Sequence, residues 1–320
     1  MGEAPYHVIA RSVAHVPAKA GDEAISRPQS HGYSRSRPPG HATTHLHTNN
    51  PTGPGMSLTA HSHSAEDDRK PAGSLRLIGS ALLWMAVALL GAAAGAVIAG
   101  FVVGFAAALM RMHLFPVWYR LNASLFTLVG AFSLQGVFLI GALRQANRIG
   151  HGRRRSGLGW GPIDHRGAVV ALATILLCCD CALIVLVGHF PLLHRLAARA
   201  GSFAFGPVHL GSAWQLPVLA CRVVLIVVIA PVCEELFFRG WLWTGLRRVW
   251  SISPVMLVTA ALWLAMHLAD GMYRPLFLIP AAIILTAVRA TAGSVRASIA
   301  AHMMSNGFVI ALVMSMAMFR

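Results

Sequence analysis

Charged side chains are scarce in this sequence, and acidic side chains are the scarcest. Charged residues make up 12% of the 320 residues, whereas soluble domains carry about 25%. Only 11 residues are Asp or Glu, and beyond Glu66 the only glutamates are the adjacent pair Glu234 and Glu235. Because hydrophobic residues make up 56% of the chain, a water-soluble domain is excluded and a polytopic membrane protein is predicted.

Cysteine is also sparse and forms no disulfide framework. There are five cysteines; Cys178, Cys179 and Cys181 lie inside an apolar run, and Cys233 precedes the glutamate pair. An odd count without regular loop spacing argues against disulfides. We therefore assign the cysteines to packing, with a metal cluster and a nucleophilic Cys233 as the weaker alternatives.

Basic residues are in excess, with a formal net charge of +15. Nearly all of them are arginines, and those beyond the N-terminal region lie mainly in short connections between apolar runs. This distribution is typical of the positive-inside rule. We therefore predict membrane lipid as a partner, no nucleic-acid partner, and a cytoplasmic N-terminus.

Large apolar residues are rare in residues 1–73, which hold about half of the histidines and prolines. Such a segment buries too little apolar surface to offset the entropy of ordering. We predict a disordered tail, with transition-metal binding by its histidines as the weaker alternative.

The rest of the chain predicts an all-α, polytopic transmembrane helical bundle of about seven spans, since each apolar run approaches or exceeds the length that crosses a bilayer. The predicted spans are Leu75–Met110, Ala123–Leu143, Gly167–Phe190, Gln215–Phe238, Pro254–Ala269, Pro275–Val288 and Ser294–Met318. The first run favours one long helix with small residues for close packing, and a hairpin, giving eight spans, is the alternative. The fifth and sixth runs are short, which predicts tilted, re-entrant or buried helices.

Polar side chains interrupt the later spans in three clusters. The first holds Glu234, Glu235 and Arg239, where Glu235 and Arg239 are i,i+4 neighbours and Glu234 points about 100° away. The arginine can hold Glu235 and leave Glu234 free to face a cavity, while Pro231 can kink or widen the helix. The alternative is a buried ion pair that locks two helices together.

The other two clusters carry histidine. His267 follows Trp263 by one helical turn, and Asn306 follows His302 by one turn. A lone histidine in a helix is more often a core residue than a ligand. Together, however, polar side chains at membrane depth predict a shared functional cavity.

These groups fit hydrolysis by an activated water. A glutamate can act as the general base. Two histidines can position the same water, or they can complete a Glu, His, His set that holds a divalent metal such as zinc. Asn306 or a protonated histidine can donate to the oxyanion of a tetrahedral intermediate. Whether a metal is used stays open at this point, with Glu234, His267 and His302 as its candidate ligands.

In order and spacing, the clusters resemble the motifs of the CPBP intramembrane proteases, also called the type II CAAX prenyl protease or ABI family. The motif E-E-x-x-x-R is matched by Glu234, Glu235 and Arg239, F-x-x-x-H by Trp263 and His267, and H-x-x-x-N by His302 and Asn306. Tryptophan stands where that family has phenylalanine, which changes the shape of the pocket more than its chemistry. The resemblance covers residues 157–320 and leaves 74–156 as N-terminal helices with a basic cytoplasmic loop.

The resemblance implies a helical membrane fold with a cavity open to the cytosol, and (metallo)endopeptidase activity on a membrane-associated protein or peptide. The implied catalytic residues are Glu234, His267 and His302, with Asn306 as the oxyanion or water partner and Glu235 and Arg239 bracing the site. Two alternatives are a non-proteolytic member serving in immunity, as a scaffold or in regulation, and a proton-coupled transporter. The alanine-rich, arginine-over-lysine composition indicates a bacterial plasma membrane, where a prenylated substrate is not expected.

Overall fold

The computed structural model describes residues 69–109, 115–199 and 215–318, and all of its regular elements in these ranges are helical. The predicted tail lies almost wholly outside the described residues. The elements are α2 (Arg69–Leu109), α3 (Phe115–Ile149), α4 (Arg154–Gly157), α5 (Arg166–His189), α6 (Pro191–Arg199), α7 (Gln215–Val224), the π-helix η1 (Leu225–Ile229), α8 (Ala230–Glu235), the π-helix η2 (Leu236–Leu242), α9 (Trp243–Leu246), α10 (Ile252–Met266), the 3₁₀-helix η3 (His267–Asp270), α11 (Arg274–Ala292) and α12 (Val295–Met318).

Seven helical stretches in the described part of the chain are long and apolar enough to cross a membrane, which confirms the predicted helical bundle. They are Gly73–Ala106, Leu125–Ile149, Arg166–His189, Leu216–Leu246, Ile252–Asp270, Arg274–Ala292 and Val295–Met316. The protein is therefore an integral membrane protein.

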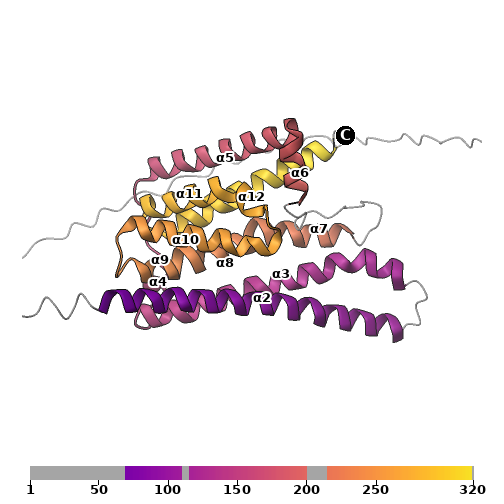
Figure 1. Ribbon diagram of the computed structural model, residues 1–320, viewed down its shortest axis with the longest axis horizontal. Helices are drawn as coiled ribbons and strands as arrows, with labels where there is room; N and C mark the ends of the chain where they lie inside the picture. Colours follow the sequence, from indigo (N-terminus) through magenta and orange to yellow (C-terminus); the bar gives the residue numbers. More distant parts are fainter. Residues whose placement is uncertain (1–68, 110–114, 200–214, 319–320) are drawn as a thin grey trace, which may run out of the picture. The chain divides into compact units, whose positions relative to one another are not determined.

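The first apolar run forms one helix, as favoured over the hairpin. Helix α2 is 41 residues long and packs along α3 (Figure 1). Glycines permit this approach, because a Cβ atom on Gly130 would lie 2.9 Å from the Ala92 carbonyl oxygen, and one on Gly95 would overlap Ser133 Oγ. The small residues of the run thus allow the close packing that the sequence predicted.

The fourth span is irregular where it carries the glutamates. It departs from α-helical geometry twice, in η1 before Pro231 and in η2 after Glu235. Proline has no N–H to donate, so the turn before it must reorganise, and widening to a π-helix is one way to do so. The sequence predicted that Pro231 can kink or widen this helix, and widening is what the structure shows. The span also extends to Leu246, beyond the predicted end at Phe238.

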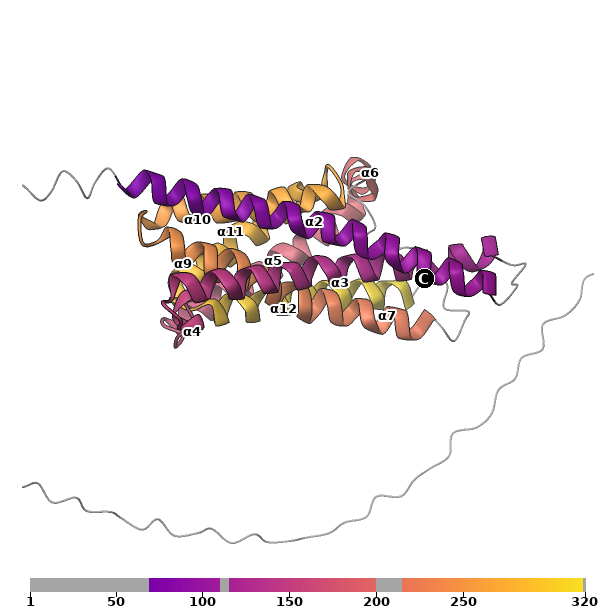
Figure 2. The ribbon, with the colours of Figure 1, turned by 90° about the horizontal axis from the view of Figure 1, so that it is seen from below.

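Helices outside this span pack on it and on one another. Helix α3 lies beside α7 (Figure 2) and also contacts α8 and η2. Helix α12 contacts η1, α8 and η2, and α5 packs on α11 and α12. The two short predicted spans are each 19 residues long in the structure, and α10 tightens into the 3₁₀-helix η3 beginning at His267. The change from α-helix to 3₁₀-helix thus falls at a predicted site residue.

The connection between α3 and α5 is tied to the turn between α11 and α12. The amide of Asp164 donates to the Ala292 carbonyl (3.1 Å), the Ser294 hydroxyl donates to the Gly161 carbonyl (2.9 Å), and the Val295 amide donates to the Gly159 carbonyl (3.2 Å). Gly293 ends α11 with φ of 64°, a left-handed conformation that favours glycine. Two stretches far apart in sequence therefore form one fixed corner of the bundle.

Candidate active site

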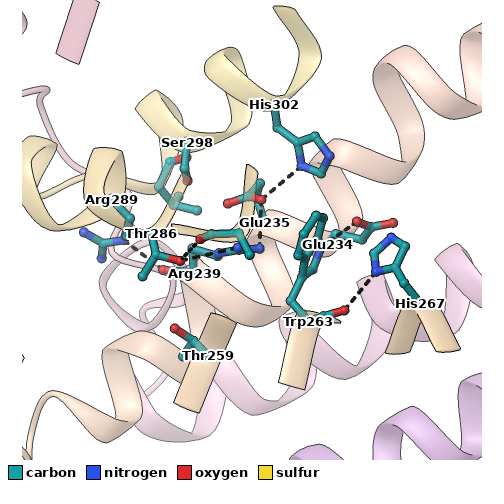
Figure 3. A network of polar contacts seen from close by, with 12 residues as sticks. Glu234, Glu235, Arg239, Thr259, Trp263, His267, Thr286, Arg289, Ser298 and His302 are labelled. Carbon is teal, nitrogen blue, oxygen red and sulfur yellow. Dashed lines mark hydrogen bonds and ion pairs between the residues drawn. The ribbon is translucent and has the colours of Figure 1, made fainter. Parts of the chain in front are cut away.

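The glutamate pair lies in the buried interior, between the two π-helical segments. Glu234 is 5% exposed and Glu235 is fully buried, both at the C-terminal end of α8. Figure 3 shows side chains from α8, η2, α10, α11 and α12 around the pair. Local departures from α-helical geometry often accompany functional sites, because they redirect side chains and free backbone groups.

Glu235 is held by two basic side chains. Its Oε1 lies 3.1 Å from Arg239 Nη1 and 3.0 Å from His302 Nδ1. The predicted i,i+4 pairing with Arg239 is thus present. Arg239 is fully buried, and its Nη2 donates to Thr286 Oγ1 on α11 (3.5 Å). Burying this pair costs desolvation, which its mutual attraction and hydrogen bonds offset only in such close geometry.

Glu234 is held by two neutral donors, so it is not free as the sequence suggested. Its Oε1 accepts a hydrogen bond from Gln135 Nε2 on α3 (3.1 Å), and its Oε2 accepts one from the indole Nε1 of Trp263 (2.8 Å). Hydrogen bonds to a charged acceptor are about twice as strong as neutral ones. The carboxylate is therefore fixed in orientation from two different helices.

Trp263 joins the parts of the site. Besides the contact with Glu234, its ring lies 4.5 Å from the His267 ring and 5.7 Å from the His302 ring, measured between centroids. Arg239 Cζ lies 5.0 Å from its centroid, in the geometry of a cation–π contact. Glu234, His267, His302 and Arg239 therefore meet around one aromatic ring, and Glu235 contacts two of them.

The hydrogen bonds of the two histidines define which ring nitrogen is left over. Nδ1 of His302 faces the Glu235 carboxylate, and Nδ1 of His267 faces the Trp263 carbonyl at 2.8 Å. A carbonyl and an ionised carboxylate only accept, so both Nδ1 atoms carry hydrogen. The Nε2 atom of each ring therefore remains for substrate or water.

Asn306 lies away from this network. Its Nδ2 donates to the Ile226 carbonyl in η1 at 2.8 Å. Asn306 and His302 share a face of α12, but the structure directs the amide to the widened backbone turn and not to the glutamates. The role implied for it by the resemblance, as an oxyanion or water partner, stays a prediction.

The candidate metal ligands are not gathered into a metal-binding cluster. Within the described ranges, no three His, Cys, Asp or Glu side chains are arranged to hold one ion. Both oxygens of Glu234 accept hydrogen bonds, and His302 and His267 direct Nδ1 to other partners. Glu234, His267 and His302 are thus not gathered around one position, although each ring keeps the Nε2 that a metal would need.

Gln135 is the site residue that the sequence analysis missed. It is 6% exposed, lies on a helix that was assigned to the N-terminal part of the chain, and reaches Glu234 across 99 sequence positions. The available signal was an amide in an otherwise apolar span, which marks a functional candidate in the same way as a charge does. The indole donor of Trp263 was likewise missed, because the sequence analysis considered only the effect of this ring on the shape of the pocket.

Comparison with known proteins identifies one family over the segment that carries most of this site. Residues 216–308 match the family model described as type II CAAX prenyl endopeptidase Rce1-like. Neither a curated protein nor a solved structure matches the chain. The matched segment contains all six predicted catalytic residues, whereas Gln135 lies outside it. Over this segment, the chain is similar to the Rce1-like type II CAAX prenyl endopeptidases.

Proposed function

We propose that the protein is an intramembrane endopeptidase that hydrolyses a peptide bond in a membrane-associated protein or peptide. The observation that carries this proposal is the pairing of two buried glutamates with different partners. Glu235 pairs with the Arg239 guanidinium and contacts His302, whereas Glu234 forms no ion pair with a described cation. A purely structural ion pair needs one carboxylate, which Glu235 provides. The second carboxylate, Glu234, is therefore available to take part in the reaction.

In this proposal Glu234 is the general base. It takes a proton from a water, whose oxygen attacks the carbonyl carbon of the scissile peptide. The C–N bond then breaks, and Glu234 returns the proton to the leaving nitrogen. Hydrolysis thus ends with a carboxyl group, an amine and Glu234 ionised again.

The two histidines and the arginine are proposed to position the reactants and to stabilise the oxyanion of the tetrahedral intermediate. In the proposal His302 is the imidazolium, with its Nδ1–H on Glu235 and its Nε2–H donating to the oxyanion. His267 orients the water or the peptide through Nε2. Arg239 holds Glu235 and thereby keeps His302 in place.

We further propose a bacterial plasma membrane and a cytoplasmic N-terminus. Arginines gather in the connection between α3 and α5 and after α9, while fewer flank the opposite ends of the helices. The positive-inside rule places the richer connections in the cytoplasm. The substrate is then expected to present its cleavage site to the cytoplasmic half of the membrane, close to the end of α8.

The test is to replace Glu234 with Gln and, separately, His267 with Ala, and to compare membrane proteomes with those of cells carrying the unaltered protein. One membrane protein is expected to accumulate uncleaved in both variants, with its processing slowed by roughly 10²–10⁴-fold, the range for loss of an acid–base group. Each variant must also be present in the membrane at the normal level.

A matched control is His189→Ala. His189 on α5 also places Nδ1 on a carbonyl four residues earlier, at 2.9 Å from Val185, but it is exposed and outside the site. Processing should be normal in this variant. Normal processing in Glu234→Gln and His267→Ala would instead favour a non-proteolytic member of the family.

A further inference from the structure

A cavity with a basic lining lies beside the active site, at the corner where four segments meet. It has a volume of about 320 Å³ and is lined by Gly159, Trp243, Thr244, Arg247, Ile252, Arg289, Ala290 and Gly293. Two of the eight lining residues are arginines and none is acidic. At about 30 Å³ per water, the space is roughly that of ten waters, which is ample for a small anion.

Arg289 is the main cation of this cavity. It is 5% exposed, yet it forms no ion pair with a carboxylate in the described residues. Its Nε donates to the Arg239 carbonyl at 2.8 Å, and its Cζ lies 5.5 Å from the Trp243 centroid. The hydrogen bond to the Arg239 carbonyl and the indole fix the guanidinium, and Arg289 lines the cavity.

Thr244 supplies a hydroxyl to the same space. Its Oγ1 is buried without a hydrogen-bond partner, which is costly unless a ligand or water completes it. A methyl group on Gly159, where φ is 59°, would lie 3.0 Å from this Oγ1 and would overlap Arg289 Nη2. Glycine at this position therefore lets the guanidinium and the hydroxyl lie close together.

The cavity lies at the level where the helices leave the membrane. Thr244 is near the end of the span Leu216–Leu246, Ile252 begins the next span, and Arg289 is near the end of Arg274–Ala292. Phosphate groups of lipids are concentrated at this depth, and basic pockets between helices bind them. A guanidinium is also suited to phosphate, because its planar N–H groups match two phosphate oxygens at once.

We propose that this cavity binds a phosphate group, held by Arg289, Arg247 and the Thr244 hydroxyl. Such a ligand would contact the guanidinium that also fixes the backbone of Arg239, one residue of the active site (Figure 3). The same chemistry is offered by inorganic phosphate and by the headgroup of an anionic phospholipid. The proposal is independent of proteolysis, so it can be tested without a substrate.

The experiment uses the full chain in a neutral detergent. Inorganic phosphate is titrated at constant ionic strength, and the unfolding temperature is followed, since a ligand of the folded state raises it. In parallel, the protein is reconstituted with phosphatidylcholine and phosphatidylglycerol, and the lipid retained after extraction is identified by native mass spectrometry. The variants are Thr244→Val, Arg247→Gln and Thr244→Ser, with Thr174→Val and Arg195→Gln as controls away from the cavity.

The expected result is binding that is weakened about tenfold or more in Thr244→Val and Arg247→Gln, because each removes a donor to a charged ligand. Thr244→Ser keeps the hydroxyl and should bind normally, as should both controls. If inorganic phosphate raises the unfolding temperature and the variants weaken this effect as expected, the ligand is free phosphate. If only phosphatidylglycerol is retained and the same variants lose it, the ligand is a lipid headgroup. The proposal fails if neither ligand binds, or if all variants respond alike.

Discussion

Glu234 and Glu235 are neighbours in the chain, but their partners differ in charge and come from different parts of the sequence. Glu235 faces Arg239 and His302, both of them inside the segment that matches the family model. Glu234 accepts from an indole and an amide, and the amide comes from α3, outside that segment. One carboxylate is thus held by an arginine and a histidine, and the other by two neutral donors.

In the proposed mechanism, this difference separates two tasks of the site. A buried ion pair with a fixed arginine is costly to break, so Glu235 is suited to holding helices and His302 in place. Neutral donors orient a carboxylate without placing a permanent cation on it, so Glu234 can exchange a proton. Variants on the Glu235 side should therefore affect stability first, and variants on the Glu234 side should affect turnover first.

The largest effect is expected for Arg239→Met. This change removes the cation from a fully buried pair and leaves Glu235 with His302 alone, at a cost of about 3–5 kcal/mol. The unfolding temperature in detergent should fall by roughly 10 °C. Arg195→Met, at an exposed arginine on α6, is the control and should shift it little. A normal unfolding temperature for Arg239→Met would show that the ion pair does not stabilise the fold.

Gln135→Leu should act on turnover instead. It removes the donor to Glu234 Oε1 and puts an apolar group in its place, while the Oε1 atom of Gln135 has no partner to lose. Loss of a hydrogen bond to a charged group, about 1.5–3 kcal/mol, corresponds to a decrease in kcat of about 10- to 100-fold. KM and the unfolding temperature should change little, because the lost contact orients the base.

The control for this variant is Gln145→Leu. Gln145 lies on the same helix and donates to Ser80 Oγ at 3.1 Å, away from the glutamates. Its kcat should stay normal. Equal losses of kcat in both variants would mean that α3 acts only through its packing.

The sequence predicted the parts of this site that depend on local spacing. Apolar runs predicted the helices, and the i,i+4 rule predicted the pairing of Glu235 with Arg239, because both follow from the geometry of one helix. The order of the motifs predicted that the glutamates, His267 and His302 come from successive spans. Their convergence on Trp263 agrees with that expectation.

Contacts that depend on how helices dock could not be predicted in the same way. Gln135 reaches Glu234 only because α2 and α3 pack beside α8 and η2, which no periodicity encodes. Asn306 shares a helix face with His302, yet the widened turn at η1 offers it the Ile226 carbonyl. The backbone change at Pro231 was foreseeable, but not which carbonyl it would present.

The smallest effect is expected for Trp263→Phe, which tests the second donor to Glu234. Phenylalanine keeps an aromatic ring beside His267 and His302 but removes the indole N–H that lies 2.8 Å from Oε2. The smaller ring leaves room for a water, and a bridging water is nearly as good a donor as the group it replaces. The expected decrease in kcat is therefore only about three- to tenfold, with KM near normal. A decrease as large as that of Gln135→Leu would mean that no water enters and that the two neutral donors hold the base equally. An unchanged kcat would mean that Gln135 is the group that orients Glu234. The difference between the two glutamates would then depend on the contact from α3 alone.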